Sequence, residues 1–184
     1  MKACCSESCF GTFMGMAKSA SHNDGTPCDQ VAALPWRFGG DGRIRVLLVT
    51  SRTNGKWMLP KGWPVAGKSP AEAAAIEARE EAGVEGHTSE AAVGSYHYIK
   101  VFEDGTSAPA QALIYPLRVT EELSKWDEKG QRKRSWFRLN KAAQAVFEPD
   151  LRRFLLGLGE DTLVLFARSE VRRRRPDVLD PQSA

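Results

Sequence analysis

The pattern of apolar and polar positions divides this chain into short strand-like runs around one long helix-like segment. Runs rich in Val, Ile, Leu and aromatic residues, bounded by Gly, Asn and Asp, are typical of strands. The segments expected to form strands are 30–36, 43–51, 56–59, 90–102, 111–120 and 133–139. Two short helices are expected after them, from Asn140 through Phe147 and from Pro149 to about Leu158.

The segment from Ser69 to Gly83 carries every signal of a helix. Ser69 is a preferred N-cap, Pro70 suits the first helical position, and Glu72 completes a capping box. Gly83 supplies the C-terminal stop. A stripe of small side chains at helical spacing predicts close packing against a sheet. The stripe consists of Ala71, Ala74, Ala75, Ala78 and Ala82.

Three carboxylates occupy a neighbouring face of this predicted helix. Glu77, Glu80 and Glu81 stand at positions i, i+3 and i+4. Like charges at this spacing oppose helix formation, and a hard divalent cation such as Mg²⁺ relieves the repulsion through oxygen ligands. On their own, three glutamates are more often a solvated acidic face.

The loop before the helix offers two interpretations. Residues 62–69 read GWPVAGKS, which matches the GxxxxGK[ST] pattern of a phosphate-binding P-loop. Such a loop binds phosphate through successive backbone N–H groups, and Pro64 and Pro70 each remove one. The three glutamates would also repel the bound anion, and no apolar run ends in the Asp that a P-loop enzyme uses for Mg²⁺. We treat this match as coincidence.

The same loop and helix resemble the box GX5EX7REUXEEXGU of Nudix hydrolases, where U is a bulky aliphatic residue. The residues that match at the required intervals are Gly62, Glu77, Glu80, Glu81, Gly83 and Val84, with Ala78 at the first aliphatic position. Lys68 stands where the first Glu is expected, and Ile76 where the Arg is expected. We interpret these two departures as coupled, with Ile76 packing under Trp63 and Pro64 and Lys68 directed to solvent.

The resemblance covers roughly residues 30 to 158. Segments 46–52 and 57–62 resemble the strand, turn and loop that precede a Nudix box, and 132–143 is similar to the end of diphosphoinositol polyphosphate phosphohydrolases. It implies an α/β fold, a Nudix-type α/β/α sandwich around a mixed β-sheet. Periodicity alone supports only α/β or α+β.

The resemblance also implies a reaction, the attack of water on a phosphorus atom of a diphosphate linkage. Glu77, Glu80 and Glu81 are the expected catalytic and metal-binding residues, with Mg²⁺ as cofactor and Mn²⁺ as a substitute. One of them, or a carboxylate of a later loop, would accept the proton of the attacking water. The loop candidates are Glu103, Asp104, Glu121, Glu122 and Glu128, each of which is also a plausible surface charge.

A phosphorylated substrate needs cations and a pocket wall in addition to the metal. The expected substrate-binding residues are Arg52, Lys61, Gly62, Trp63, Arg132 and Arg134. Strand alternation places Arg132 and Arg134 on one face and Lys133 on the other. Arg37 is a weaker candidate, and the aromatic residues Trp57 and Trp136 fit the core better than a pocket.

Composition limits the class of protein. The chain has 184 residues and a net charge of +3, which fits one globular domain and gives no indication of a nucleic-acid partner. We expect a flexible extension at 1–28, a Nudix domain at 29–160 and a basic tail at 161–184 that contains four consecutive arginines, 172–175. All four cysteines precede residue 29, and we expect reduced thiols there, since their spacing fits a zinc motif poorly and the expected core has no cysteine for a disulfide framework. With no membrane segment, the cytoplasm is the expected location.

Three functional hypotheses follow. The leading one is a Mg²⁺-dependent hydrolase that cleaves a diphosphate linkage in a highly phosphorylated small molecule: a diphosphoinositol polyphosphate, a dinucleoside polyphosphate or polyphosphate. The second is an ADP-ribose or nucleoside-diphosphate pyrophosphatase. The third is a non-catalytic nucleotide sensor, suggested by the departures at Lys68 and Ile76. The three matching glutamates favour an enzyme.

Overall fold

The structure, a computed structural model, describes residues 28–102, 104–159 and 162–164. Its strands are β1 Cys28–Phe38, β2 Ile44–Thr50, β3 Trp57–Met58, β4 Lys61–Gly62, β5 Val84–Thr88, β6 Gly94–Val101, β7 Ser107–Glu122 and β8 Arg134–Arg138. Its helices are α1 Pro70–Ala82, α2 Leu139–Ala145 and α3 Pro149–Gly157. The cysteine-rich start, Glu103 and the four-arginine run lie outside the described residues.

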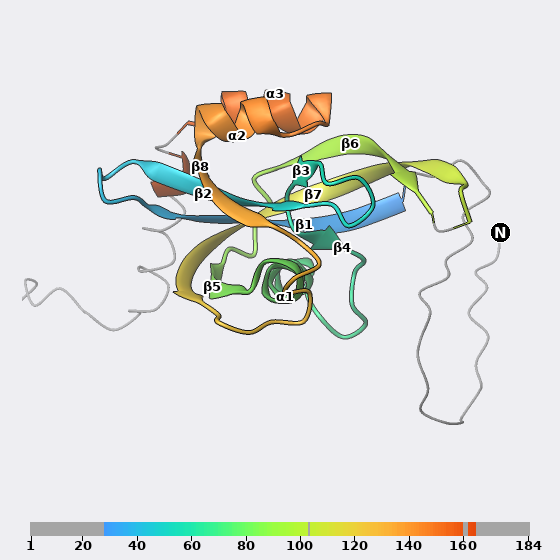
Figure 1. The fold of residues 1–184 in the computed structure, drawn as a ribbon, viewed down its shortest axis with the longest axis horizontal. Helices are drawn as coiled ribbons and strands as arrows, with labels where there is room; N and C mark the ends of the chain where they lie inside the picture. Colours follow the sequence, from blue (N-terminus) through green and yellow to red (C-terminus); the bar gives the residue numbers. More distant parts are fainter. Residues whose placement is uncertain (1–27, 103, 160–161, 165–184) are drawn as a thin grey trace, which may run out of the picture.

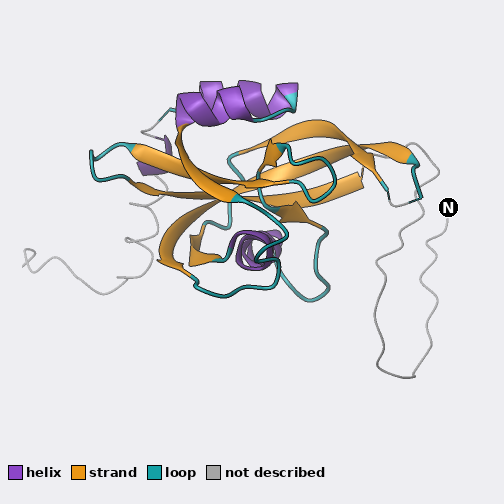
Figure 2. Cartoon of the chain, viewed as in Figure 1, coloured by secondary structure: helices purple, strands orange, loops and turns teal. Residues whose placement is uncertain are grey.

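One mixed sheet forms the middle of the molecule. Its main path is β3-β2-β1-β7-β5, with β4 on β1, β6 on β7 and β8 on β2. Strands β1 and β7 are parallel, and the other strand pairs are antiparallel. Helix α1 lies on one face, and α2 and α3 lie on the other (Figure 1; Figure 2). The expected α/β/α sandwich around a mixed sheet is confirmed.

Strand alternation explains why the sheet needs a helix layer on both sides. In β1, Val31 and Ala33 pack into the core on the α1 side, and Ala32 and Leu34 into the core on the α2–α3 side. All four side chains are buried. A central strand that is apolar on both faces reads as a continuous run, which is why segment 30–36 shows little alternation.

Helix α1 forms as its sequence predicts. The Ser69 hydroxyl accepts a hydrogen bond from the Glu72 N–H, the Glu72 carboxylate accepts one from the Ser69 N–H, and Gly83 ends the helix in the left-handed region at φ 61°. The alanine stripe packs on the sheet, with Ala75 half-buried and Ala73 buried beside it. Small side chains let the helix axis lie close to β1 and β4.

Several features differ from the sequence-based prediction, among them strand β4, which lies in a segment expected to be loop. Strand β5 was not expected, because Val84–Thr88 has only one apolar residue. In the structure its pairing with β7 is interrupted by a bulge at Glu85/Gly86. A Cβ atom at Gly86 would lie 2.0 Å from the Arg118 carbonyl oxygen, so the glycine allows close contact with β7. Asn140 was expected to cap a helix, but α2 begins earlier, with Arg138 at its N-cap. The buried Leu163 lies beyond the expected domain boundary at residue 160.

Candidate active site

The site is built where the two-residue strand β4 contacts α1, at Glu77 and Glu81. Gly62 pairs with Val31 of β1, and its Cα faces the Glu77 carboxylate. A Cβ atom on Gly62 would lie 1.8 Å from Glu77 Oε1, so only glycine leaves room for this carboxylate. Glu77 and Glu81 are 7% and 6% exposed, whereas Glu80 is half-buried. Two of the three expected metal ligands are therefore buried carboxylates on one helix face.

Glu81 is held from two directions. The Lys61 N–H donates to Glu81 Oε2 at 3.1 Å, and the Arg132 guanidinium donates to Oε1. Strand β4 thus orients the carboxylate on one side, and the segment before β8 orients it on the other. Two of the four basic residues expected to bind substrate therefore contact Glu81, Lys61 through its backbone and Arg132 through its side chain. These contacts were not anticipated from the sequence.

Arg132 links this carboxylate to the β7–β8 loop. Its side chain is 6% exposed and also donates to Glu128 and, at 3.0 Å, to the carbonyl oxygen of Thr50. Glu128 in turn pairs with the partly exposed Arg52 at 3.2 Å. Of the loop carboxylates considered from the sequence, Glu128 is thereby joined to Glu81 through a shared guanidinium. The Arg132 guanidinium already donates to two carboxylates, Glu81 and Glu128. In this arrangement it therefore orients these carboxylates and does not face a substrate phosphate.

Burial and neighbouring charges shift the pKa values of Glu81 and Lys61. Burial raises the pKa of Glu81 to about 7, and Glu77 adds to this, while Arg132 and Lys61 oppose it. Burial also lowers the pKa of Lys61 to about 8, against the charge of Glu81. Desolvation is therefore only partly balanced by the neighbouring opposite charges. Additional positive charge beside Glu77 and Glu81 would stabilise their ionised forms.

The donor chemistry of this face fits a hard divalent cation. Glu77, Glu80 and Glu81 offer carboxylate oxygens only, which are the ligands that Mg²⁺ and Mn²⁺ accept. Within the described part of the chain, no three acidic, histidine or cysteine side chains are already arranged as a metal cluster. Both oxygens of Glu81 accept protein hydrogen bonds. Each oxygen keeps a lone pair that a metal ion could use, and a shift of the Arg132 guanidinium would free a further one.

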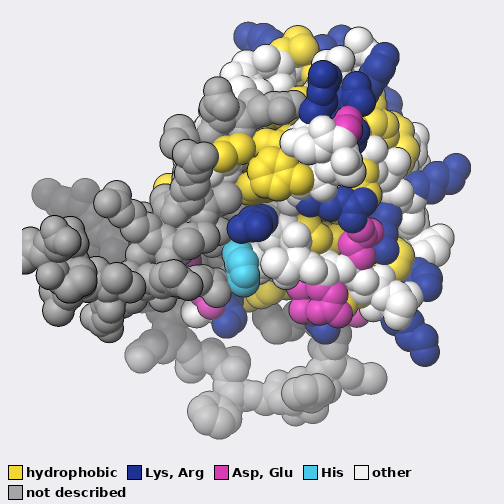
Figure 3. Space-filling view, turned by 90° about the vertical axis from the view of Figure 1, so that its left-hand side faces the viewer, with side chains coloured by type: hydrophobic (Ala, Val, Ile, Leu, Met, Phe, Trp, Pro, Cys, Tyr) yellow, Lys and Arg dark blue, Asp and Glu magenta, His cyan; other side chains and the backbone are white. Residues whose placement is uncertain are grey.

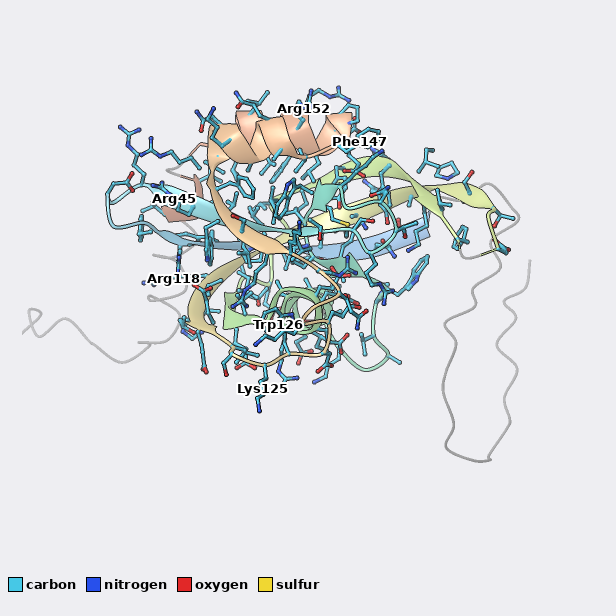
Figure 4. The ribbon with its side chains drawn as sticks, viewed as in Figure 1. Arg45, Arg118, Lys125, Trp126, Phe147 and Arg152 are labelled. Carbon is cyan, nitrogen blue, oxygen red and sulfur yellow. The ribbon has the colours of Figure 1, made fainter. Side chains whose placement is uncertain are left out.

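Arg134 has a different environment from the one expected of a substrate ligand. Its guanidinium donates to the carbonyl oxygens of Ala82 and Gly83 at 2.6 and 2.8 Å, at the C-terminal end of α1. It also stacks on Trp126, 4.2 Å from the ring centre. Trp126 lies on the α1 side of the sheet, and Phe147 on the opposite side (Figure 4). Both Arg132 and Arg134 reach α1, but Arg132 precedes the start of β8, so strand alternation is not what brings them together.

Replacing Arg134 by Gln is therefore expected to destabilise the fold. The variant loses charge-assisted hydrogen bonds to helix carbonyls, and the free energy of unfolding should fall by about 1–3 kcal/mol. Thermal unfolding measures this, with Arg138→Gln as the control, because that exposed arginine makes only a surface ion pair with Asp41. A raised KM with unchanged stability would instead support the substrate-binding role.

The loop that departs from the box is only partly explained by the structure. Lys68 points to solvent as expected, with its ammonium 3.3 Å from Glu72 Oε1. Ile76 and Trp63 are half-buried, and Pro64 is exposed. The contact of Ile76 with Trp63 or Pro64 stays a prediction, as does the role of Trp63 in the pocket.

One group near the site was missed from the sequence. Glu148 is the N-cap of α3, but its side chain makes no capping hydrogen bond. Among the described residues, its Oε2 atom is buried without a hydrogen-bond partner, and so is the hydroxyl of Tyr96. The sequence signal is the position of Glu148 directly before the helix-opening Pro149, where Ser, Thr, Asp or Asn is preferred.

A family model and several known proteins match most of the described chain. The NUDIX domain model matches residues 29–158. Nudix hydrolase 17 of Arabidopsis thaliana, described as mitochondrial, is 33% identical over 121 residues, 62% of this chain and 64% of its own length. Human diphosphoinositol polyphosphate phosphohydrolase 3-alpha is 32% identical over 112 residues, 59% of this chain and 64% of its own length. Across five Arabidopsis relatives, the match covers only 52% to 66% of the relative's length.

Solved structures show the same fold at low sequence identity. A binary complex of Caenorhabditis elegans Ap4A hydrolase superposes with a TM-score of 0.53 at 18% identity, over 75% of this chain and 97% of that one. The NUDIX domain of Shewanella oneidensis NrtR, in complex with ADP ribose, gives 0.50 at 16% identity, over 79% and 89%. The family model spans most of the described chain and includes the loop, the helix and their buried glutamates, so this chain belongs to the NUDIX domain family.

Proposed function

We propose that this chain is a Mg²⁺-dependent hydrolase of a diphosphate linkage in a phosphorylated small molecule. The observation that carries the proposal is the pair of buried carboxylates, Glu77 and Glu81, held beside Gly62. Burying two like charges on one helix face costs free energy, and a divalent cation would offset that cost. Glu77, Glu80 and Glu81 would hold the ion, which supplies charge neutralisation of the phosphates and a more acidic water.

The protein's own groups have complementary parts in this proposal. Lys61 and Arg52 are the cations that would contact phosphate oxygens. The Lys61 ammonium would act as a compact charge, and the planar Arg52 guanidinium could donate two parallel hydrogen bonds. Lys61 lies next to Glu81, and Arg52 is more than half exposed. Glu128 is the loop carboxylate we favour for accepting a proton, because Arg132 ties it to Glu81. By contrast, Glu122, the last residue of β7, pairs with Arg37 and Arg134.

A panel assay tests the proposal. Diphosphoinositol polyphosphates, dinucleoside polyphosphates, polyphosphate and ADP-ribose would each be incubated with Mg²⁺, Mn²⁺ or EDTA, and the released products measured. Turnover of at least one substrate with Mg²⁺ and none with EDTA is expected. Turnover that is equally fast in EDTA would contradict the proposal.

A non-catalytic nucleotide sensor is the second candidate. It is favoured by Lys68 in the place of the box glutamate and by the engagement of both Glu81 oxygens within the protein. The NrtR domain, whose structure holds ADP ribose, is a neighbour in fold. Tight binding of a nucleotide with no turnover under either metal would decide for the sensor.

The proposed partner is a phosphorylated small molecule in the cytoplasm, where reduced cysteines are stable. No described helix has the length and apolar character of a membrane span. On the face that Figure 3 shows, acidic side chains lie among the Lys and Arg. Asp41 pairs with both Arg45 and Arg138, and Glu122 pairs with Arg37. This pairing neutralises basic charge that nucleic acid would need.

A further inference from the structure

On the sheet face opposite α1, a second polar group lies close to the site. Gln30 of β1 and Tyr96 of β6 both pair with Ala112 of β7, so they flank it in one row. The Tyr98 hydroxyl donates to the Gln30 side chain, and the Lys61 ammonium lies 4.8 Å from the Tyr98 ring centre. The Lys61 backbone holds Glu81 on the catalytic side. Lys61 therefore contacts both groups, the catalytic carboxylate through its backbone N–H and Tyr98 through its ammonium.

Glu148 joins this group from the α2–α3 junction. Val146 forms an isolated bridge with Trp57, which brings the junction alongside β3, and Phe147 receives the Lys56 ammonium on its ring at 3.0 Å. Phe147 is labelled at this place above the sheet in Figure 4. Glu148 acts electrostatically on both Lys61 and Tyr96, which agrees with its place at this junction.

Two polar atoms of this group lack partners within the described chain. They are Glu148 Oε2 and the hydroxyl of Tyr96, a residue that is 1% exposed. An unsatisfied buried polar group is costly, and a carboxylate more so, so natural proteins rarely keep one without a use. Glu148 as a whole is half-buried, so it also keeps contact with solvent. The carboxylate and the hydroxyl therefore both keep hydrogen-bonding capacity that the described residues do not use.

The chemistry of the pair restricts which group could use this capacity. A carboxylate accepts hydrogen bonds and repels phosphate, whereas a tyrosine hydroxyl both donates and accepts. The matching group is an uncharged donor, such as a ribose hydroxyl or a nucleobase amino group. An inositol ring that carries phosphate at most positions offers few such donors and brings like charge to Glu148.

We propose that Glu148, with Tyr96, is a specificity-determining residue that binds an uncharged donor of the substrate and so selects nucleoside-linked diphosphates over inositol polyphosphates. This rests on the proposed function, because the donor must lie next to the diphosphate that the Glu77–Glu81 face hydrolyses. Both residues would act on substrate binding and leave the reacting atoms to the other face.

Steady-state kinetics with Mg²⁺ test the proposal on ADP-ribose, Ap4A and a diphosphoinositol polyphosphate. Glu148→Ala should raise KM for a nucleoside substrate roughly 10- to 100-fold with little change in kcat, since a hydrogen-bonded charge is lost. For the inositol substrate KM should stay level or fall. Tyr96→Phe, which removes one hydroxyl, should act in the same direction and more weakly. Asp150→Ala is the matched control, because that carboxylate also lies at the start of α3 but pairs with Arg153 and His97.

Equal effects on both substrate classes, or no effect on the nucleoside substrates, would overturn the selectivity. If the wild type turned over nothing, the proposed hydrolase function would fail while this proposal remained testable. ADP-ribose and diphosphoinositol polyphosphate binding would then be measured by calorimetry. Weaker ADP-ribose binding by Glu148→Ala than by Asp150→Ala would support it, and equal binding would refute it.

Discussion

Replacing Glu81 by Gln is expected to lower hydrolysis by about two orders of magnitude or more, with the fold retained. The substitution keeps the size of the side chain and its ability to accept from Lys61 and Arg132, but removes a ligand charge. Loss of residues that merely orient metal ligands typically costs about 10–100-fold, so loss of a ligand should cost more. Initial rates with Mg²⁺ measure the effect. Glu85→Gln is the control, since it removes an exposed carboxylate just after the same helix.

The stability of this variant should depend on pH in a defined direction. Burial raises the pKa of Glu81 from 4.5 to about 7, so the folded state prefers the protonated form that Gln resembles. Without metal, the free energy of unfolding of the wild type relative to the variant should fall as pH rises from 4.5 to about 7 and then stay level. A solvated acidic face predicts no such change and undiminished turnover.

Replacing Gly62 by Ala is expected to abolish most of the activity through Glu77. The new methyl group would occupy the position of the Glu77 carboxylate, 1.8 Å from its Oε1 atom. Because that carboxylate ends a flexible side chain, it can turn away, and the fold should survive with a loss of about 1–3 kcal/mol. Hydrolysis should fall about 100-fold or more, as metal ligands tolerate little displacement.

Gly157→Ala is the matched control for this experiment, because a Cβ atom there would meet nothing within 4 Å. Rates and thermal midpoints of both variants separate a local effect from a folding defect. Full activity in Gly62→Ala would show that Glu77 has no part in the reaction.

The local elements around α1 were predictable because each depends on a few neighbouring residues. The capping box of Ser69 and Glu72, the stop at Gly83 and the face shared by Glu77 and Glu81 follow from spacing alone. The solvent-directed side chain of Lys68 was predictable from its place in the loop. These features came out as expected.

Contacts between segments that lie far apart in the sequence could not be predicted. The link from Glu81 through Arg132 to Glu128 depends on how the β7–β8 loop returns to α1, and nothing in local pattern fixes that path. Arg134 was expected at the substrate for the same reason, since a strand arginine does not reveal the helix carbonyls it will meet. Glu148 became notable only when its buried oxygen was found without a partner in the described chain.

If the buried face of α1 holds the catalytic cation, metal titration of Glu77 and Glu81 variants should show it. Mg²⁺ and Mn²⁺ binding would be measured by calorimetry above pH 7, where Glu81 is ionised. The variants would be the double substitution Glu77→Gln with Glu81→Gln, and Glu72→Gln, whose carboxylate is half exposed on the same helix. We predict that the wild type and Glu72→Gln bind one cation with similar affinity and that the double variant does not. Equal binding by all three proteins would show that Glu77 and Glu81 do not hold the cation.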